Sequence, residues 1–554
     1  MPLVDQSKPP HFCLTVPFFE YTILAGRRDR LMRASSGSPI AAHGDKPWRY
    51  AVFERAKSFP EHLASWLNQH SRVFLLCFSV LYLFGTGLIA SRRFLWADEV
   101  LTAYMARLSI PQLWSALKAG VDIEPPLFHL ITRGFTGIFG YSPLALRAPA
   151  IVGGWLMCIS LYVFVSRRMR PSYGLIAMLI PFVTGVARYT YEARCYGIAL
   201  GFSGAALVCW QGAAEQRRRR FSLIGLTICL AAAIACQYYM FLVLMSIAVG
   251  EILRSISRAQ TDRSVWIALA AAVIPLPLHF PFIRAAMTFH GGDWSTATGF
   301  TLLTAYEIFL APAILPAAAI VTSLAVCDYF GATAKPAGNS PFPPWEILLG
   351  FALASSLAGA FLVAKLTNGI FTLRYGICLI FGFALLPLPV IWRYDRIRPL
   401  AGTLSLIVLA GFFTLHMLRY QSRFQTPPLL LTASHSSVIV IEDPLDFMEL
   451  AYNAPPQVAS RLYYLISQRE SIRYTGTDDD ERGLLLLRRW APIQAEPLNE
   501  FLNGHKRILI WRGNKYQDRR WLLRSLIDHG TTVTLAQKSD SESLFIAIRQ
   551  PGTW

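Results

Sequence analysis

Long apolar stretches, separated by short basic loops, repeat along most of the chain. An apolar stretch of about 18 or more residues can cross a hydrocarbon core about 30 Å thick as an α-helix. On this pattern we predict about eleven transmembrane helices, at residues 71–91, 144–166, 173–189, 196–211, 221–236, 240–253, 265–283, 301–326, 345–364, 371–391 and 400–418. Residues 127–139 are apolar but short, so we expect a re-entrant or interfacial helix there. The pattern therefore predicts a polytopic α-helical membrane protein.

Composition supports the membrane assignment and limits the partners. Of the 554 residues, 54% are hydrophobic and 16% are charged, whereas soluble domains carry roughly a quarter charged residues. The net charge of +18 comes largely from Arg clusters in short loops, such as residues 167–170, 217–220 and 393–398. This distribution follows the positive-inside rule for cytoplasmic loops and argues against nucleic acid as a partner. The nine cysteines include no CxxC pair, so they indicate neither a disulfide framework nor a zinc site.

The charge pattern also predicts the orientation. Residues 1–70 are polar and lack the features of a cleaved secretory signal. We expect them to form a cytoplasmic, largely disordered extension that is helical over residues 58–70. With this extension inside, the basic loops fall in the cytoplasm and residues 92–143 form a long outer segment. We therefore predict a multi-pass protein of the bacterial inner membrane whose transmembrane module spans residues 71–419.

The pattern of apolar and polar residues changes after the last long apolar run. Within residues 420–554, "SSVIVIEDPLDFMELAYNAP" has the pattern of a strand followed by a helix, and "RILIWRGNKYQDRRWLLRSLIDHG" repeats it. We predict a small α/β domain in the periplasm. It contains neither a GxGxxG motif nor a P-loop, so nothing in it supports nucleotide binding.

Polar groups gather in four stretches that the predicted topology places on the outer side. They are the Asp98–Glu99 pair, "DIEPPLFHL" with Glu124, "ARYTYEARCYG" with Glu192 and Arg194, and "AKLTNGIFTLRYG" with Lys365, Arg374 and Tyr375. Taken singly, each has an ordinary explanation: a solvated acid pair, a helix start, an exposed ion pair of small value, or an interfacial anchor. Together they place ionisable groups at one edge of the bilayer, where such groups are costly and indicate function.

The same residues carry a resemblance to a known group of enzymes. "FLWADEVLTAYMA", "EPPLFHLITRGFTGIFGYSPLALRAPAIVGG", "ARYTYEARCYGIALG" and "FTLRYG" occur in this order. They resemble the C-type (GT-C) integral membrane glycosyltransferases, in particular the protein O-mannosyltransferase-like family (glycosyltransferase family 39) and its bacterial relatives, including the lipid A aminoarabinose transferases. The resemblance is ordered over residues 94–207 and looser up to residue 419. It implies a GT-C fold and a polyprenyl phosphate sugar as donor.

The implied reaction assigns roles to the residues. An acceptor hydroxyl attacks the anomeric carbon with inversion, which requires a carboxylate to take the proton and cations to hold the leaving phosphate. Neighbours on a helix lie about 100° apart, so Asp98 and Glu99 cannot both face one atom. The resemblance makes Asp98 the general base, while Glu99 orients the segment through backbone or Arg contacts and Glu192 is a second family acid. The substrate-binding and phosphate-binding candidates are Arg194, Arg374, Tyr375, Arg92 and Lys365.

No cofactor is required by this reaction, but the resemblance raises the question of a divalent metal. Some relatives bind one near a Glu in the position of Glu124, with a His from a later outer loop. His290 or His279 could supply that ligand here, and His129 is near Glu124 in sequence. No spacing such as HxxxH supports the site independently.

Other functions remain open from the sequence. A transporter or flippase is the alternative, although we find no inverted repeat of the kind that transporters contain and nearly all the acids lie at outer ends of spans. A non-catalytic assembly or sensor protein is a further possibility. For the transferase, partners would be the polyprenyl phosphate sugar, membrane lipids, and an acceptor that is a glycan, a lipid or a protein.

Overall fold

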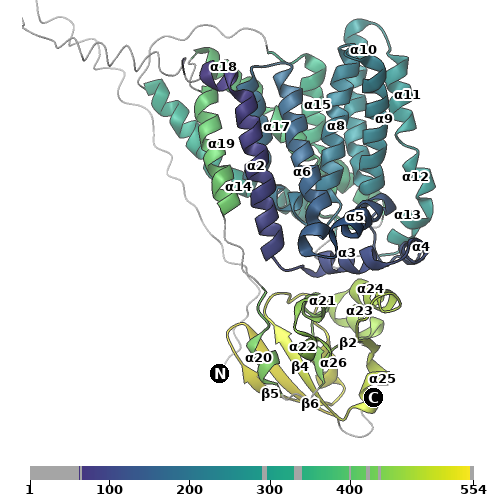
Figure 1. The fold of residues 1–554 in the computed structure, drawn as a ribbon. Helices are drawn as coiled ribbons and strands as arrows, with labels where there is room; N and C mark the ends of the chain where they lie inside the picture. The colour runs from purple at the N-terminus through teal and green to yellow at the C-terminus, as the bar shows by residue number, and fades with distance from the viewer. Residues whose placement is uncertain are drawn as a thin grey trace, which may run out of the picture. The chain divides into compact units, whose positions relative to one another are not determined.

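The computed structural model describes residues 62, 65–289, 296–329, 340–367, 369–397, 401–418, 424–433 and 438–549. The expected N-terminal extension lies almost entirely outside these residues. Long apolar helices run side by side in a bundle (Figure 1). They are α2 (Ser71–Arg92), α6 (Pro143–Ser166), α8 (Tyr196–Ala214), α9 (Arg219–Cys236), α10 (Phe241–Arg258), α14 (Gly299–Tyr329) and α19 (Ala401–Leu418). By length and composition, seven of the described helices could cross a membrane, or up to nine if each of two bent pairs is one span.

Shorter helical pieces complete the bundle. They are α7 (Pro171–Leu179), η1 (Ile180–Val183), η2 (Ala187–Thr190), η3 (Tyr238–Met240), α11 (Arg263–Ala271), α12 (Pro275–Leu278), α13 (Phe280–Ala286), α15 (Pro344–Ala354), α16 (Ser356–Leu366), η5 (Leu373–Gly376), α17 (Leu379–Leu385) and α18 (Pro387–Ile397). Two expected spans are bent pairs: residues 265–283 bend by 61° and residues 345–364 by 49°. The first bend follows Pro275 and Pro277, which interrupt helical hydrogen bonding.

Two other expected spans are shorter than predicted. The helix expected at residues 173–189 ends at Val183, and the chain then passes through turns to Tyr196. Within the span expected at residues 371–391, the α-helix begins only at Leu379, and the 3₁₀ turn η5 precedes it. In both places the prediction of a continuous helix was wrong. Both places also hold candidate site residues, which therefore lie on irregular backbone.

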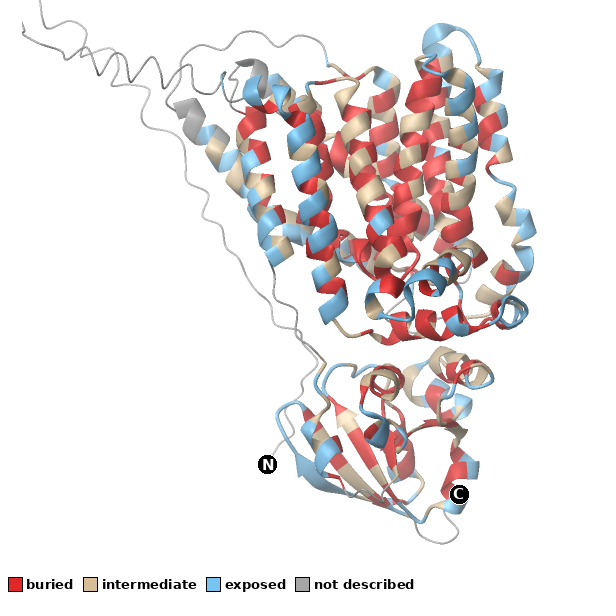
Figure 2. Cartoon of the chain, viewed as in Figure 1, coloured by how far each residue is buried: buried red, intermediate tan, exposed pale blue. Residues whose placement is uncertain are grey.

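The centre of the bundle is close-packed and its rim is apolar. Figure 2 shows that α8 is buried along most of its length, whereas α2 exposes many residues. The exposed side chains of α2 include Leu76 and Phe84. Since these are large apolar groups on a helix long enough to span a bilayer, this face contacts lipid. At the centre, Gly153 of α6 meets Gly197 of α8 so closely that an added Cβ would lie 2.3 Å from the Gly197 carbonyl oxygen.

The outer segment consists of three helices rather than a loop. They are α3 (Ala97–Arg107), α4 (Ile110–Ala119) and α5 (Pro126–Phe139). α4 begins with a capping box in which Ser109 Oγ accepts from the Gln112 N–H, and it ends at Gly120 in the left-handed region with φ = 82°. Pro125 and Pro126 start α5, because proline suits the first positions of a helix. These short helices hold α3 and its acids beside the end of α2 and the start of α6.

The C-terminal region is an α/β domain, as predicted. Its sheet has the strand order β3-β2-β1-β4-β6-β5. The first four strands run parallel, and β6 pairs antiparallel with β4 and β5. The strands are β1 (Ile439–Ile441), β2 (Leu462–Ile466), β3 (Ala495–Pro497), β4 (Arg507–Gly513), β5 (Thr532–Lys538) and β6 (Glu542–Ile548).

Helices cover both faces of this sheet. The main ones are α21 (Pro444–Asn453), α23 (Gln468–Thr475), α24 (Asp479–Leu487), α25 (Leu498–Gly504) and α26 (Leu522–Asp528), with short turns at α20 (Pro428–Thr432) and α22 (Pro456–Ala459). Ile439 and Ile441 of β1 join the apolar cluster that includes α21, while Val440 joins the cluster that includes α25 and α26. Successive side chains of β1 therefore pack into two apolar cores, one on each face of the sheet. Asn453 at the end of α21 donates a hydrogen bond to the Leu95 carbonyl, 2.8 Å away.

Candidate active site

The neighbouring acids Asp98 and Glu99, at the start of α3, point into different surroundings. The helix begins at Ala97, and Glu99 reaches back so that its Oε2 accepts the Trp96 backbone N–H at 3.3 Å. This contact satisfies one of the free N–H groups at the helix start. Glu99 is fully buried, whereas the Asp98 side chain is one-quarter exposed. The two neighbours therefore face different surroundings, as their angular spacing on a helix requires.

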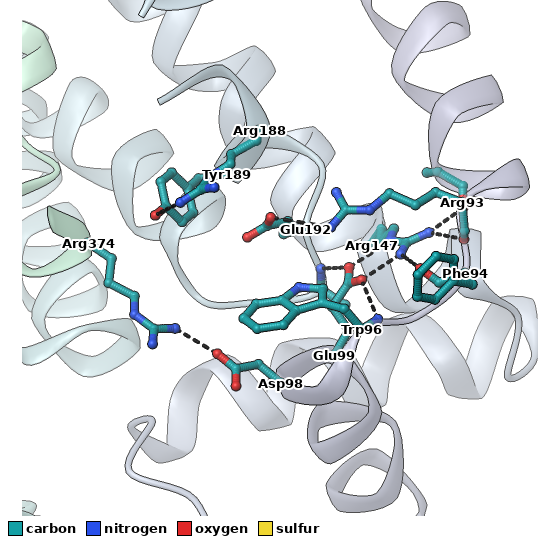
Figure 3. A network of polar contacts seen from close by, with 12 residues as sticks. Arg93, Phe94, Trp96, Asp98, Glu99, Arg147, Arg188, Tyr189, Glu192 and Arg374 are labelled. Atoms are coloured by element: carbon teal, nitrogen blue, oxygen red, sulfur yellow. Dashed lines mark hydrogen bonds and ion pairs between the residues drawn. The ribbon is translucent and has the colours of Figure 1, made fainter. Parts of the chain in front are cut away.

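Glu99 is the acid of a buried ion pair with Arg147 of α6. The Arg147 Nε lies 2.7 Å from Glu99 Oε1 and its Nη2 lies 2.6 Å from Oε2, which is a bidentate arrangement. Glu99 Oε1 also accepts the Ala193 backbone N–H at 2.8 Å. Glu99 thus contacts both an arginine and a backbone N–H group, the two kinds of partner that we expected for it. They tie α3, α6 and the turn before α8 together (Figure 3).

Arg147 is a residue whose importance the sequence analysis missed. Beyond Glu99, its Nη1 and Nη2 groups donate to the carbonyls of Ala90, Arg93 and Phe94 at 2.7–2.8 Å. These carbonyls lie where α2 ends and the chain turns into the outer segment. The signal was available, because Arg147 is a charged residue inside an apolar stretch, and such residues are costly unless they have a purpose.

Asp98 pairs with a cation that is distant from it in the sequence. Its Oδ2 accepts a hydrogen bond from Arg374 Nη1 at 2.6 Å, and both side chains are one-quarter exposed. Burial acts to raise the pKa of Asp98, but the charges of Arg374 and Arg194 outweigh burial and hold the pKa below its ordinary value. Asp98 is therefore an ionised carboxylate at neutral pH. It is accessible and already next to a cation that matches phosphate geometry.

A second acid and two further arginines lie beside this pair (Figure 3). Glu192 Oε1 is 3.5 Å from Arg93 Nη2, and its side chain is 6% exposed. Burial raises the pKa of Glu192, and the nearby Glu99 adds to the effect while Arg93 opposes it. Arg188, on η2, is exposed and donates from Nη2 to the Tyr189 hydroxyl at 2.7 Å. Sequence analysis did not single out Arg188, although it lies within the quoted "ARYTYEARCYG" stretch.

Arg194 is the centre of a buried network rather than an open binding residue. Its Nη2 donates to Glu124 Oε1 at 2.7 Å, and its Nη1 lies 3.3 Å from Asp122 Oδ2. The same Nη1 donates to the Asp98 backbone carbonyl at 3.2 Å. Burial raises the pKa of Glu124, although Arg194 opposes the shift. Arg194 thus holds the backbone that carries Asp98.

The metal prediction rests on Glu124, whose buried Oε2 has no hydrogen-bond partner among the described residues. Glu124 Oε1 is engaged by Arg194 and by the Tyr196 hydroxyl at 3.4 Å. His129 is fully buried, and burial lowers its pKa to about 4. His279 packs on the Tyr238 ring, and His290 lies outside the described residues. Within the described part of the chain, no group of three His, Cys, Asp or Glu is placed to hold a metal ion.

The remaining candidates differ in their placement. The Tyr375 ring stacks on Tyr239 with centroids 4.3 Å apart, next to Arg374. Lys365 is exposed near the end of α16, where its Nζ lies 5.9 Å from the centre of the Phe361 ring. Arg92 is exposed in the last turn of α2. Among the described residues, no hydrogen bond or ion pair joins Lys365 or Arg92 to the cluster around Asp98.

Comparisons with known proteins bear on the fold and the family. Residues 123–283 match the model of the family described as dolichyl-phosphate-mannose-protein mannosyltransferase. No curated protein sequence matches the chain. Among solved structures, ArnT from Cupriavidus metallidurans, in complex with undecaprenyl phosphate, matches with a TM-score of 0.50 and 11% identity, over 86% of this chain and 97% of that chain. An oligosaccharyltransferase from Archaeoglobus fulgidus matches with a TM-score of 0.39 and 10% identity, over 81% and 70%.

The two kinds of comparison support each other. The family match spans α5 to α13 and includes the segment that holds Glu124, Glu192 and Arg194. The ArnT match extends the shared architecture across most of the chain. The described structure supplies the apolar helices of a multi-pass membrane protein and the small C-terminal sheet. Together these findings show that the chain has the fold of ArnT, a multi-pass bundle of apolar helices, and that residues 123–283 resemble the dolichyl-phosphate-mannose-protein mannosyltransferase family.

Proposed function

We propose that this enzyme transfers a sugar from a polyprenyl phosphate donor to a hydroxyl group of an acceptor, at the outer face of the bacterial inner membrane. The observation that carries the proposal is the accessible contact between the Asp98 carboxylate and the Arg374 guanidinium. One group can take a proton and the other can hold a phosphate. ArnT, which has the same fold, was solved with undecaprenyl phosphate, and this supports a polyprenyl-linked donor here.

Asp98 would act as the general base of an inverting displacement. The acceptor oxygen forms a bond to the anomeric carbon while the bond from that carbon to the phosphate oxygen breaks. The electron pair of the broken bond stays with the leaving phosphate, and the hydroxyl proton passes to Asp98. Arg374 would stabilise the charge that gathers on the phosphate, which is the place where a fixed cation lowers the barrier most.

The surrounding charges would position these two groups. Arg147 and Glu99 fix the start of α3, and Arg194 holds the Asp98 carbonyl. Preorganised groups save reorganisation during the reaction. The raised pKa of Glu192 makes it a candidate to exchange a proton with bound substrate. No step of this mechanism is routed through a divalent metal.

The orientation belongs to the same proposal. The Arg-rich loops at residues 167–170 and 217–220 lie at helix ends opposite to α3 along α6 and α8. By the positive-inside rule these loops are cytoplasmic. The Asp98 site and the C-terminal domain would then face the periplasm, where donor headgroup and acceptor meet at the membrane surface.

Mass spectrometry of the envelope would test the function directly. Glycolipids and glycoproteins are compared between the parent strain, a deletion strain, and deletion strains that carry either the wild-type gene or Asp98→Asn. We expect the deletion to lack one sugar, the wild-type gene to restore it, and Asp98→Asn to fail at equal protein level. Restoration by Asp98→Asn would contradict the transferase mechanism and favour a transporter or flippase, for which this carboxylate has no catalytic duty.

A further inference from the structure

The arginines around Asp98 differ in whether they have an acidic partner. Arg374 pairs with Asp98, Arg93 with Glu192, and Arg147 with Glu99. Arg188 has no carboxylate within ion-pair distance among the described residues; it contacts Tyr189 through the 2.7 Å hydrogen bond and lies 4.7 Å over the ring. Among the described residues of this cluster, Arg188 is therefore a guanidinium that no carboxylate contacts directly.

Arg188 is nevertheless held in a defined place. Tyr189 is buried, and its ring packs edge-on against Tyr196 with centroids 5.2 Å apart. The Tyr189 hydroxyl occupies one nitrogen of the guanidinium and leaves the others available. The charge of Arg188 acts on Glu192 and on Arg374, so these groups share one electrostatic environment. Figure 3 shows Arg188 and Tyr189 above Glu192 in the view, with Arg374 and Asp98 lower down.

We propose that Arg188 is the first anchor of the donor's anionic phosphate, and that Arg374 moves from Asp98 to this phosphate as the donor binds. This inference rests on the proposed function and names two steps within it. Arg188 can accept the phosphate without breaking an ion pair. Arg374 cannot, because it must first leave the carboxylate that it contacts at 2.6 Å.

The exchange fits the charge changes of the reaction. A sugar phosphodiester carries one negative charge, and the phosphate monoester that leaves carries close to two. The proton from the acceptor goes to Asp98, so the charges balance. An interaction that strengthens as negative charge grows on the leaving phosphate raises kcat rather than ground-state affinity. We therefore expect Arg374 to act mainly on kcat. When Arg374 departs, Asp98 loses the cation that lowers its basicity, and it becomes a better base at the moment it is needed.

Binding to undecaprenyl phosphate tests the anchor. The full chain in lipid nanodiscs is titrated with undecaprenyl phosphate and, as an uncharged control, with undecaprenol. Arg188→Ala should weaken phosphate binding roughly tenfold or more, the typical loss for a charge-assisted hydrogen bond, and leave undecaprenol binding unchanged. Arg284→Ala, at an exposed arginine of α13, is the matched control and should bind like wild type. Unchanged phosphate binding by Arg188→Ala would overturn the proposal.

The Asp98→Asn variant tests the exchange. Removing the carboxylate's charge frees Arg374 in advance, so affinity for undecaprenyl phosphate should rise a few-fold even though transfer is lost. Equal or weaker binding by Asp98→Asn contradicts the exchange. In steady-state transfer, Arg188→Ala should chiefly raise the donor KM, while Arg374→Ala should chiefly lower kcat. The opposite split also contradicts the exchange.

These outcomes are distinct from a failure of the proposed function. If wild type transfers sugar and Arg188→Ala does so with an unchanged donor KM, the function stands and this inference is wrong. If wild type neither binds undecaprenyl phosphate nor transfers sugar from such a donor, both are wrong.

Discussion

The Asp98 carboxylate and the Arg374 guanidinium meet at 2.6 Å although they are 276 positions apart in the sequence. One comes from the first turn of the outer helix α3 and the other from the 3₁₀ turn η5 near the end of the bundle. A partly exposed ion pair stabilises a fold by about 1 kcal/mol or less. The ion pair therefore contributes little to the stability of the fold. A role in the proposed reaction explains its position better.

The first prediction separates the two neighbouring acids by their effects. Asp98→Asn keeps the size of the side chain but removes the proton acceptor, so single-turnover transfer should slow by roughly a hundredfold or more. The melting temperature should change little, because the Asp98 side chain is partly exposed. Rates are measured with saturating polyprenyl phosphate sugar. Normal turnover by this variant would move the base elsewhere, with Glu192 or Glu124 next in line.

Glu99→Gln should instead damage the fold. It leaves the guanidinium of Arg147 buried without its carboxylate partner, and breaking a buried pair typically costs about 3–5 kcal/mol. We expect a clear loss of thermal stability in detergent and a lower yield of folded protein. The fraction that is folded should retain much more activity than Asp98→Asn. Wild-type stability with abolished turnover would show that the roles of the two acids are reversed.

The third prediction concerns the pH dependence that Arg374 imposes on Asp98. The pKa of Asp98 lies below its ordinary value because Arg374 and Arg194 outweigh burial. Arg374→Ala removes one of these cations, so the pKa of Asp98 should rise and the acid limb of the kcat/KM profile should move to higher pH. Arg374→Lys should restore the profile but only part of the rate, since a point charge replaces a planar fork. An unmoved acid limb in Arg374→Ala would indicate that Asp98 is not the titrating base.

The sequence predicted the class of fold, but not which charged side chains contact one another. Apolar runs are local features, and they predicted the membrane bundle. The bidentate contact of Arg147 with Glu99 depends on how α6 packs against the end of α2, which no local pattern contains. The helix predicted at residues 173–189 is shorter because Pro181 and Gly185 interrupt regular structure, so the last turn ends at Val183. That break is what places Arg188 and Glu192 in the site.

The fourth prediction tests the orientation on which every site residue depends. A phosphatase reporter that works only outside the cytoplasm should be active when fused after Gln421. It should be inactive when fused after Arg218, in the basic loop between α8 and α9. A reporter that needs the cytoplasm should give the opposite pattern at the same two positions. Activity in the reverse arrangement would put Asp98 in the wrong compartment for a periplasmic transferase.

The last prediction concerns the centre of the bundle. A Cβ added at Gly153 of α6 would lie 2.3 Å from both the Gly197 carbonyl oxygen and the Ile198 Cα, which are backbone atoms that cannot turn away. Small residues allow such close helix contacts in membranes. Gly153→Ala should therefore force α6 and α8 apart and destabilise the protein by about 1–3 kcal/mol, the usual cost of overpacking.

Gly134 of α5 is the matched control, because an added Cβ there meets nothing within 4 Å. Gly134→Ala should be neutral or stabilise the protein by up to about 1 kcal/mol, since alanine loses less conformational freedom in a helix than glycine. Thermal unfolding of both variants in the same detergent decides between the two effects. The displacement of α8 in Gly153→Ala would also shift the turn that carries Glu192 and Arg194, so transfer should fall together with stability. Equal melting temperatures for the two variants would mean that α6 and α8 are not in this close contact.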